Sequence, residues 1–143
     1  MSIEENKSLV LKMVDELFVK GNSSKVDELL SPNFIEHEQL PPGVPTGREG
    51  LKQLITILHS AFPDFNAKVE DIIAADDKVV IRMTWQGTQK GEFIGMPPSN
   101  KSMTINVFDI LRVMDGKVVE HWGLFDSMSM MQQLGAIPAP GTH

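Results

Sequence analysis

The sequence predicts an α+β fold in which a curved antiparallel sheet wraps around N-terminal helices to form a cone. Apolar residues recur at helical spacing through the N-terminal part of the chain, and from Ala67 onward the period changes to two. Two turn signals, Asp76-Asp77 and Asp115-Gly116, divide this second part into hairpins. Helices followed by antiparallel strands are typical of α+β domains, so for 143 residues we expect one domain over 1–137 and a tail over 138–143.

Capping signals indicate where the helices begin. A Ser or Thr followed three residues later by Glu is a capping box, and the chain has two of them: Ser2 with Glu5, and Thr46 with Glu49. We expect Gly21 to end the first helix, and the helix after Thr46 to run to about Phe62. Ser24 is expected to cap a short helix over about 25–30, and a last short helix is expected at about 128–134.

The strands are expected as two hairpins, preceded by a brief extended segment at 33–37. The hairpins pair Ala67–Ala75 with Lys78–Thr88, and Lys101–Met114 with Lys117–Phe125. Regular pairing outward from Asp76-Asp77 sets Asp71 opposite Arg82 and Val69 opposite Thr84.

Regular pairing in the second hairpin divides three suggestive residues between two faces. Trp122 and Asp126 share the face that is mostly apolar, and His121 falls on the other face unless a bulge at Gly123 changes the alternation. We therefore expect His37, from far upstream, to be the histidine beside Asp126.

Composition narrows the classes of partner. The formal net charge of −6 and the lack of a basic run argue against a nucleic acid or a membrane surface. With no cysteine, disulfides and thiolate chemistry are excluded. The first residues are acidic and no long apolar run follows them, so we expect a cytoplasmic protein.

Asp126 is the leading candidate for acid/base chemistry. A carboxyl beside Trp122 in an apolar cavity would have a raised pKa, because burial disfavours the charged form. The alternative is structural: Asp126 directly precedes the last helix, where Asp is a preferred N-cap, and the two roles are compatible.

Other polar and apolar side chains are weaker candidates for contact with a ligand. His37 lies beside a proline-rich loop, His121 is a half-exposed strand residue, and Arg82 either orients a ligand oxygen or forms an ion pair with Asp71. Phe62 and Met96 are apolar candidates of the same kind. His59 is expected to face solvent and Asp64 to serve a turn.

The sequence contains no convincing metal, nucleotide or nucleophile motif. His37, His121 and the acids are scattered, the glycines do not form a phosphate loop, and there is no Ser-His-Asp arrangement. We therefore expect neither a metal nor another cofactor.

Several segments, in order, resemble the SnoaL-like polyketide cyclase (ester cyclase) family over about residues 5 to 135. They are Phe34-Ile35-Glu36-His37, Gly47-Arg48-Glu49-Gly50, Ala61-Phe62-Pro63-Asp64, Gly87-Thr88 with Gly91-Glu92-Phe93-Ile94-Gly95-Met96-Pro97-Pro98, and Asp115-Gly116-Lys117 through Glu120-His121-Trp122 to Asp126. The resemblance implies the nuclear-transport-factor-2-like, or cystatin-like, α+β barrel, cofactor-free chemistry in the cone, and homodimers or tetramers formed through the sheet.

The resemblance also implies roles for particular residues. Asp126 matches the family's acid/base in an intramolecular aldol closure of a polyketide ester, His37 matches a histidine that lines the pocket, and Trp122 matches its aromatic neighbour. The pocket of this chain is expected to be rich in methionine, with candidates Met83, Met96, Met103 and Met128.

Three functions are consistent with these observations. The first is a cofactor-independent cyclase or isomerase acting on a small apolar carbonyl compound. The second is a protein of the same fold that binds a small hydrophobic molecule without turning it over. The third is an accessory dimerisation domain with an empty cone. No motif in the sequence identifies the substrate.

Overall fold

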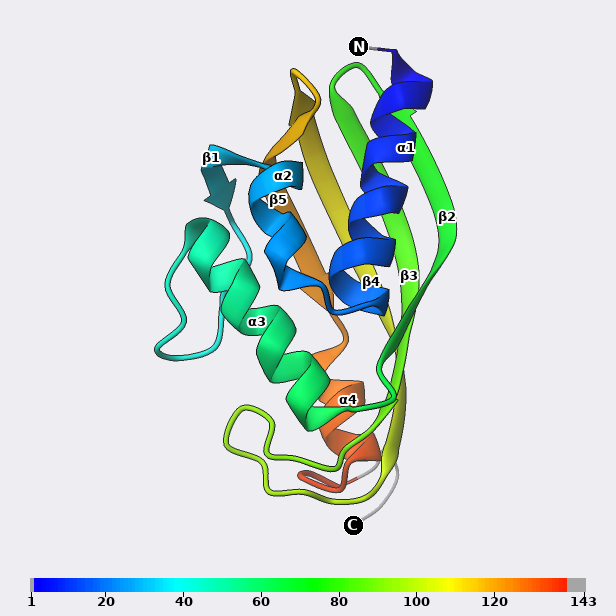
Figure 1. The fold of residues 1–143 in the computed structure, drawn as a ribbon. Coiled ribbons are helices and arrows are strands. Elements are labelled where there is room, and N and C mark those ends of the chain that lie inside the picture. Colours follow the sequence, from blue (N-terminus) through cyan, green and yellow to red (C-terminus); the bar gives the residue numbers. More distant parts are fainter. Residues whose placement is uncertain (1, 139–143) are drawn as a thin grey trace.

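A five-stranded sheet curves around helices that cover one of its faces (Figure 1). The computed structural model describes residues 2–138, so the tail predicted over 138–143 lies almost wholly outside the described residues. The strand order is β1-β5-β4-β3-β2. The strands span β1 Leu30–Glu36, β2 Asn66–Ala75, β3 Lys78–Thr88, β4 Ser102–Met114 and β5 Lys117–Phe125. The predicted α+β class with a curved sheet and N-terminal helices is confirmed.

The first helix begins where the sequence predicts. In α1 (Ile3–Met13) the Ser2 hydroxyl accepts a hydrogen bond from the Glu5 N–H, and the Glu5 carboxylate accepts one from the Ser2 N–H, so the capping box is confirmed. The helix continues as a π-helical turn, η1 (Val14–Val19). Gly21 then adopts a φ of +67°, which ends the helix at low steric cost.

Two other predicted caps are wrong. The Ser24 hydroxyl donates to Asn22 instead of capping, and the short helix consists of a 3₁₀ turn, η2 (Ser23–Lys25), followed by α2 (Val26–Leu29). At the start of α3 (Gly47–Ala61) the side chain of Thr46 makes no cap hydrogen bond. Glu49, the other residue of this capping box, accepts a hydrogen bond from the Lys52 ammonium at 3.0 Å instead of capping the helix.

The edge strand β1 pairs in parallel with its neighbour, so the sheet is not wholly antiparallel. It extends the predicted segment at 33–37 and pairs in parallel with β5, which places Glu36 next to His121. The chain passes through α3 and three strands before β5 reaches β1, so no hairpin forces the two strands to be antiparallel.

The first hairpin keeps the predicted register only near its turn. Asp71 lies opposite Arg82 as predicted, but Val69 lies opposite Met83 and not Thr84. A bulge leaves Glu70 as an extra residue, and its carboxylate accepts a hydrogen bond from the Thr84 hydroxyl at 2.9 Å.

The second hairpin contains a bulge that overturns the predicted division of faces. Val113 pairs with Val118, but Arg112 pairs with Glu120, so Val119 is an extra residue. Every later side chain of β5 is thereby moved to the opposite face. His121 and Gly123 lie opposite Leu111 and Asp109, and Trp122 lies opposite the exposed Ile110. His121, not Trp122, therefore faces the interior.

The core fills the space between the helices and the concave face of the sheet. Its fully buried members come from both layers and include Val10, Leu17, Ile55, Leu58, Ile81 and Leu111. The last helix, α4 (Ser127–Gln133), packs at the far end near the start of β4 (Figure 1). Within residues 2–138, no helix combines the length and the apolar character needed to cross a membrane.

Candidate functional site

Two neighbouring cavities lie between the helices and the sheet. The inner cavity, about 50 Å³, is lined mainly by apolar side chains, with Glu36, Glu38, Asp109 and His121 as its polar members. The outer groove is larger, about 400 Å³, and is lined by the loop after β1, the loop after β3 and the end of β5. Four residues line both the inner cavity and the outer groove and so lie at the boundary between them: Glu38, Leu40, Leu54 and Trp85.

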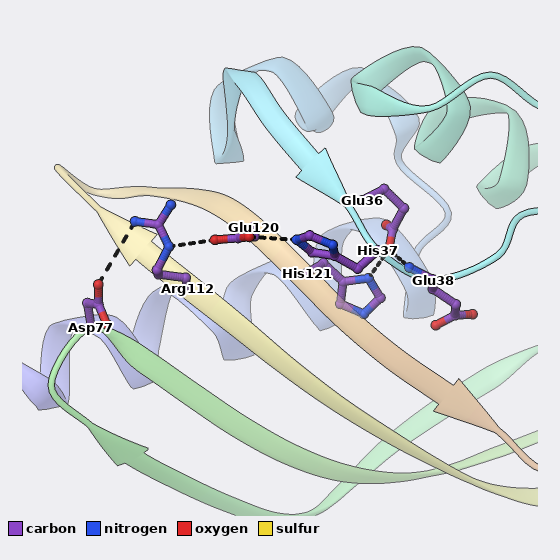
Figure 2. A network of polar contacts seen from close by, with 7 residues as sticks. All are labelled: Glu36, His37, Glu38, Asp77, Arg112, Glu120 and His121. Atoms are coloured by element: carbon purple, nitrogen blue, oxygen red, sulfur yellow. Dashed lines mark hydrogen bonds and ion pairs between the residues drawn. The ribbon is translucent and has the colours of Figure 1, made fainter.

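A histidine held between two carboxylates forms the polar end of the inner cavity. His121 on β5 lies with Nδ1 2.6 Å from Oε1 of Glu36, at the end of β1 (Figure 2). Its Nε2 lies 2.7 Å from Oδ1 of Asp109 on β4. The three strands that carry these side chains are adjacent in the sheet, in the order β1-β5-β4.

The surroundings of His121 favour its charged form. Burial alone would lower its pKa, but hydrogen bonds to Asp109 and then Glu36, and the charges of both carboxylates, outweigh burial and raise the pKa to about 10. Both ring nitrogens therefore carry protons at neutral pH and donate to the two carboxylates.

Glu38 is the carboxyl whose acidity is best suited to proton transfer near neutral pH. It follows β1, and its backbone N–H donates to Oε1 of Glu36 at 2.9 Å. Burial is the largest cause that raises its pKa to about 7, and the charge of His121 partly offsets it, while Asp109 and Glu36 raise it further. Glu38 lines both cavities, so its carboxyl lies at the boundary between them.

Gly123 leaves the space in which this cluster fits. A Cβ at this position would collide with the Asp109 carboxylate, the Glu38 carboxylate and the His121 ring. Gly123 lies directly opposite Asp109 in the β4–β5 ladder. The close approach of three polar side chains here therefore depends on a residue without a side chain.

The cluster also has the spacing of a metal site. The donor atoms of Glu38, Asp109 and His121 lie within 4.8 Å of one another, so these residues are not scattered as the sequence predicted. Because His121 uses both ring nitrogens to donate to carboxylates, a cation would have to displace a proton from the ring. The geometry suits an imidazolium between carboxylates better than a metal ligand.

A second polar network lies beside the first and orients His37. Nε2 of His37 lies 2.6 Å from the Glu120 carboxylate, to which Arg112 donates at 2.8 Å (Figure 2). The hydrogen bond from Arg112, followed by that from His37, lowers the pKa of Glu120. The His37 ring stacks on Trp122 with 4.8 Å between centroids, and His37 lines the outer groove. Its role in binding or catalysis stays a prediction.

Asp126 is the N-cap of α4, which is the structural role that the sequence allowed for it. Its carboxylate accepts a hydrogen bond from the Ser129 N–H at 3.1 Å and caps α4, and the residue is exposed. His37 is paired with Glu120 instead of Asp126. The cap is thus confirmed, and a catalytic role for Asp126 stays a prediction.

The other predicted contact residues are distributed over the molecule. Arg82 donates to Asp71 at 2.7 Å, which confirms the ion pair. Phe62 is fully buried against Gly87 and Phe93, and Met96 is half-buried in the loop after β3. Their roles as ligand contacts stay predictions.

Two surface expectations have different outcomes. His59 does not face solvent as expected, because its Nε2 lies 2.7 Å from the Phe18 carbonyl and it is half-buried. Asp64 lies in the turn before β2, as expected. Its carboxylate accepts hydrogen bonds from both the N–H and the hydroxyl of Thr88, at the end of β3. Of the four candidate methionines, Met83 lines the inner cavity, whereas Met128 is exposed.

Three members of the cluster were missed as candidates: Glu36, Glu38 and Asp109. Asp109 carried a signal, since it interrupts the apolar positions of β4 and is only 7% exposed. Glu36 and Glu38 carried no comparable signal, because their burial depends on the parallel pairing of β1 with β5.

Comparisons with known proteins agree with this architecture. The family model for SnoaL-like polyketide cyclases matches residues 8–134. The chain is 25% identical to nogalonic acid methyl ester cyclase of Streptomyces nogalater over 120 residues, or 82% of this chain and 89% of the relative. It is 28% identical to aklanonic acid methyl ester cyclase DauD of Streptomyces sp. strain C5 over 135 residues, or 89% and 80% of the two chains. The structure of TsrD from Streptomyces laurentii superposes with a TM-score of 0.86 at 27% identity, covering 96% of this chain and 99% of that one.

Proposed function

Because the chain belongs to the SnoaL-like polyketide cyclase family, we propose that it is a cofactor-independent acid/base enzyme acting on a small apolar carbonyl compound. The reaction would be the ring closure of a polyketide ester or a related proton transfer next to a carbonyl. The observation that carries this proposal is Glu38, a carboxyl with a pKa of about 7 at the boundary of two largely apolar cavities.

Glu38 would act as the base and then as the acid. Its carboxylate takes a proton from the carbon next to a substrate carbonyl, and the resulting enolate attacks a second carbonyl of the same molecule. The alkoxide formed at that second carbonyl then takes this proton from Glu38, which returns to its ionised form. A base with a pKa near the working pH combines a sufficient ionised fraction with sufficient basicity.

His121 would position this base without touching the substrate. Both of its N–H groups are already engaged by Glu36 and Asp109, so it has no proton donor left for a ligand. Its positive charge balances part of the negative charge of the cluster, which keeps the pKa of Glu38 from rising further.

Trp85 is the candidate donor for a substrate oxygen. It lines both cavities, is 8% exposed, and its indole N–H has no hydrogen-bond partner within the described residues. A buried N–H without a partner is unfavourable, so an acceptor oxygen on a ligand would satisfy it.

The proposal is tested with candidate esters and two matched variants. The purified protein is incubated with nogalonic or aklanonic acid methyl ester, the compounds named for its relatives, and products are followed by mass spectrometry. Glu38→Gln should slow turnover by about 10²- to 10⁴-fold, and Asp126→Asn should retain it. The reverse pattern would transfer the acid/base role to Asp126, as the family resemblance implies.

The binding alternative has a distinct outcome. If the protein binds a small hydrophobic molecule without reaction, native mass spectrometry will show that compound unchanged. The wild type and Glu38→Gln will then hold the same compound. Release of a converted product by the wild type alone supports the enzyme.

We also propose that the chain forms homo-oligomers through the convex face of the sheet. Apolar side chains on this face remain exposed, and they come from four adjacent strands: Ile73, Val80, Phe108, Ile110 and Leu124. Exposed apolar side chains on adjacent strands are typical of surfaces that self-associate. Phe108→Lys should shift the mass in sedimentation towards the monomer, and an unchanged mass would contradict this interface.

A further inference from the structure

We propose that Ile94 determines ligand specificity: a strained turn holds its side chain at the lip of the outer groove, where it contacts an apolar part of the ligand. This inference rests on the proposed function for the nature of the ligand. It concerns binding and not proton transfer, so the two can fail separately.

The backbone at Ile94 is strained. Ile94 has a φ of +49° and Gly95 a φ of +78°, while Phe93 and Met96 exchange backbone hydrogen bonds of 3.0 and 2.9 Å across the turn. Two consecutive residues with positive φ are typical of a type I′ turn, in which Asn, Asp and Gly are strongly preferred. A β-branched residue is disfavoured there, because its side chain crowds the backbone.

The surroundings of the turn hold Ile94 in this conformation. Gln89, which is fully buried, donates from its side-chain amide to the Met96 carbonyl at 3.1 Å. Phe93 is buried against Phe62, with 5.2 Å between ring centroids. Strain persists where neighbouring contacts over-determine a conformation, and such positions cluster at ligand sites.

The side chain that this strain presents faces the groove. Ile94 lines the outer groove while remaining 45% exposed, and it belongs to the loop between β3 and β4 that extends beneath α3 (Figure 1). The prolines Pro41 and Pro42, in the loop after β1, line the same groove from another segment. A ligand there would cover apolar side chains that are otherwise in water.

These observations identify the type of ligand group involved. The lip is apolar, whereas Glu38, which also lines the groove, carries the proton-transfer chemistry. A ligand would therefore place an apolar ring or alkyl group against Ile94 and its carbonyl towards Glu38. Replacement of Ile94 by a residue that suits the turn should relieve strain and weaken the hold on that apolar group.

Nile red, a neutral apolar dye, tests this without a known substrate. In Ile94→Asn we expect the dissociation constant from fluorescence titration to rise by about five- to tenfold, for the loss of one apolar contact. The same variant should melt roughly 3 °C higher, because Asn tolerates positive φ. Ile3→Asn is the control, since Ile3 is 42% exposed on α1 and away from the groove.

The combined result is decisive in either direction. Weaker dye binding together with a higher melting temperature in Ile94→Asn, and unchanged dye binding in Ile3→Asn, would support the inference. Unchanged dye affinity in Ile94→Asn, an equal loss in Ile3→Asn, or no binding by the wild type would overturn it. Dye binding and ester turnover are separate measurements, so a wild-type protein that binds Nile red but does not convert the esters leaves the test of Ile94 intact.

Discussion

The imidazole Nε2 of His121 lies 2.7 Å from Oδ1 of Asp109, although the residue directly opposite Asp109 in the sheet is Gly123. The two side chains are therefore diagonal neighbours on the concave face. Polar side chains can span the distance between such positions. The missing side chain at Gly123 leaves room for this contact and for Glu38 beside it. The site thus depends as much on the bulge at Val119 as on its polar residues.

The pH dependence of turnover follows from the pKa values of Glu38 and His121. We expect kcat/KM to rise with pH through about 7, as Glu38 loses its proton, and to fall as pH approaches about 10, where His121 loses its charge. In Glu38→Gln the rate should drop by about 10²- to 10⁴-fold, the usual contribution of a positioned acid/base. A profile without a limb near pH 7 would contradict the role of Glu38.

Glu38 should also lower stability as pH rises. Its pKa in the folded protein, about 7, is above the ordinary value of 4.5, so the folded state binds more protons than the unfolded chain between these values. The free energy of unfolding should therefore fall between pH 4.5 and 7. Glu38→Gln should remove this slope and be more stable than the wild type at pH 8 by about 1–2 kcal/mol, the shift discounted for partial exposure. Urea denaturation at pH 5 and pH 8 measures it.

Loss of His121 should expose the charge balance of the cluster. In His121→Asn the carboxylates of Glu36 and Asp109 lose their cation, and the free energy of unfolding at pH 7 should fall by about 3 kcal/mol, as for other broken buried ion pairs. The raised pKa of His121 stabilises the wild type fully below pH 6.5, and this contribution is lost as pH rises through about 10. The variant should lack that decline in denaturation measured from pH 7 to 10, and a persisting decline would contradict the assignment.

A side chain at position 123 should separate the polar groups of the cluster. Gly123→Ala places a Cβ against Asp109, Glu38 and His121, so we expect a loss of about 1–3 kcal/mol in stability, as for other overpacked sites. Glu38→Ala would remove one of the colliding groups. The double variant should therefore lose less stability than the sum of the two single variants in urea denaturation, and simple additivity would argue against this packing.

The cap at Asp126 separates a structural from a catalytic role. Asp126→Ala should lower stability by about 1 kcal/mol, because the Ser129 N–H loses its acceptor, and Asp126→Ser should restore most of it. Serine can cap a helix but cannot act as a carboxylate base. If Asp126→Ser is stable and active, Asp126 serves only as a helix cap. If the variant is stable but inactive, the family-based catalytic role of Asp126 is supported.

Local sequence signals determined the helices, the hairpins and therefore the class of fold. The Ser2–Glu5 box, the Asp115-Gly116 turn and the alternation of apolar residues in β3 and β4 act between neighbours, so they can be interpreted without the rest of the chain. The same reasoning identified Asp126 as a helix cap and Arg82 as the partner of Asp71, since both contacts follow directly from sequence position and regular pairing.

The tertiary structure decided which polar residues meet in the interior. The bulge at Val119 moved His121 to the concave face and Trp122 to the convex one, and a shift by one residue leaves no clear mark in a strand of mixed polarity. Glu36 and Glu38 were brought beside His121 by a parallel pairing between strands more than 80 residues apart. Such pairing depends on the packing of the whole chain, so only the folded molecule could reveal a carboxyl with a pKa near 7 at the boundary of two cavities.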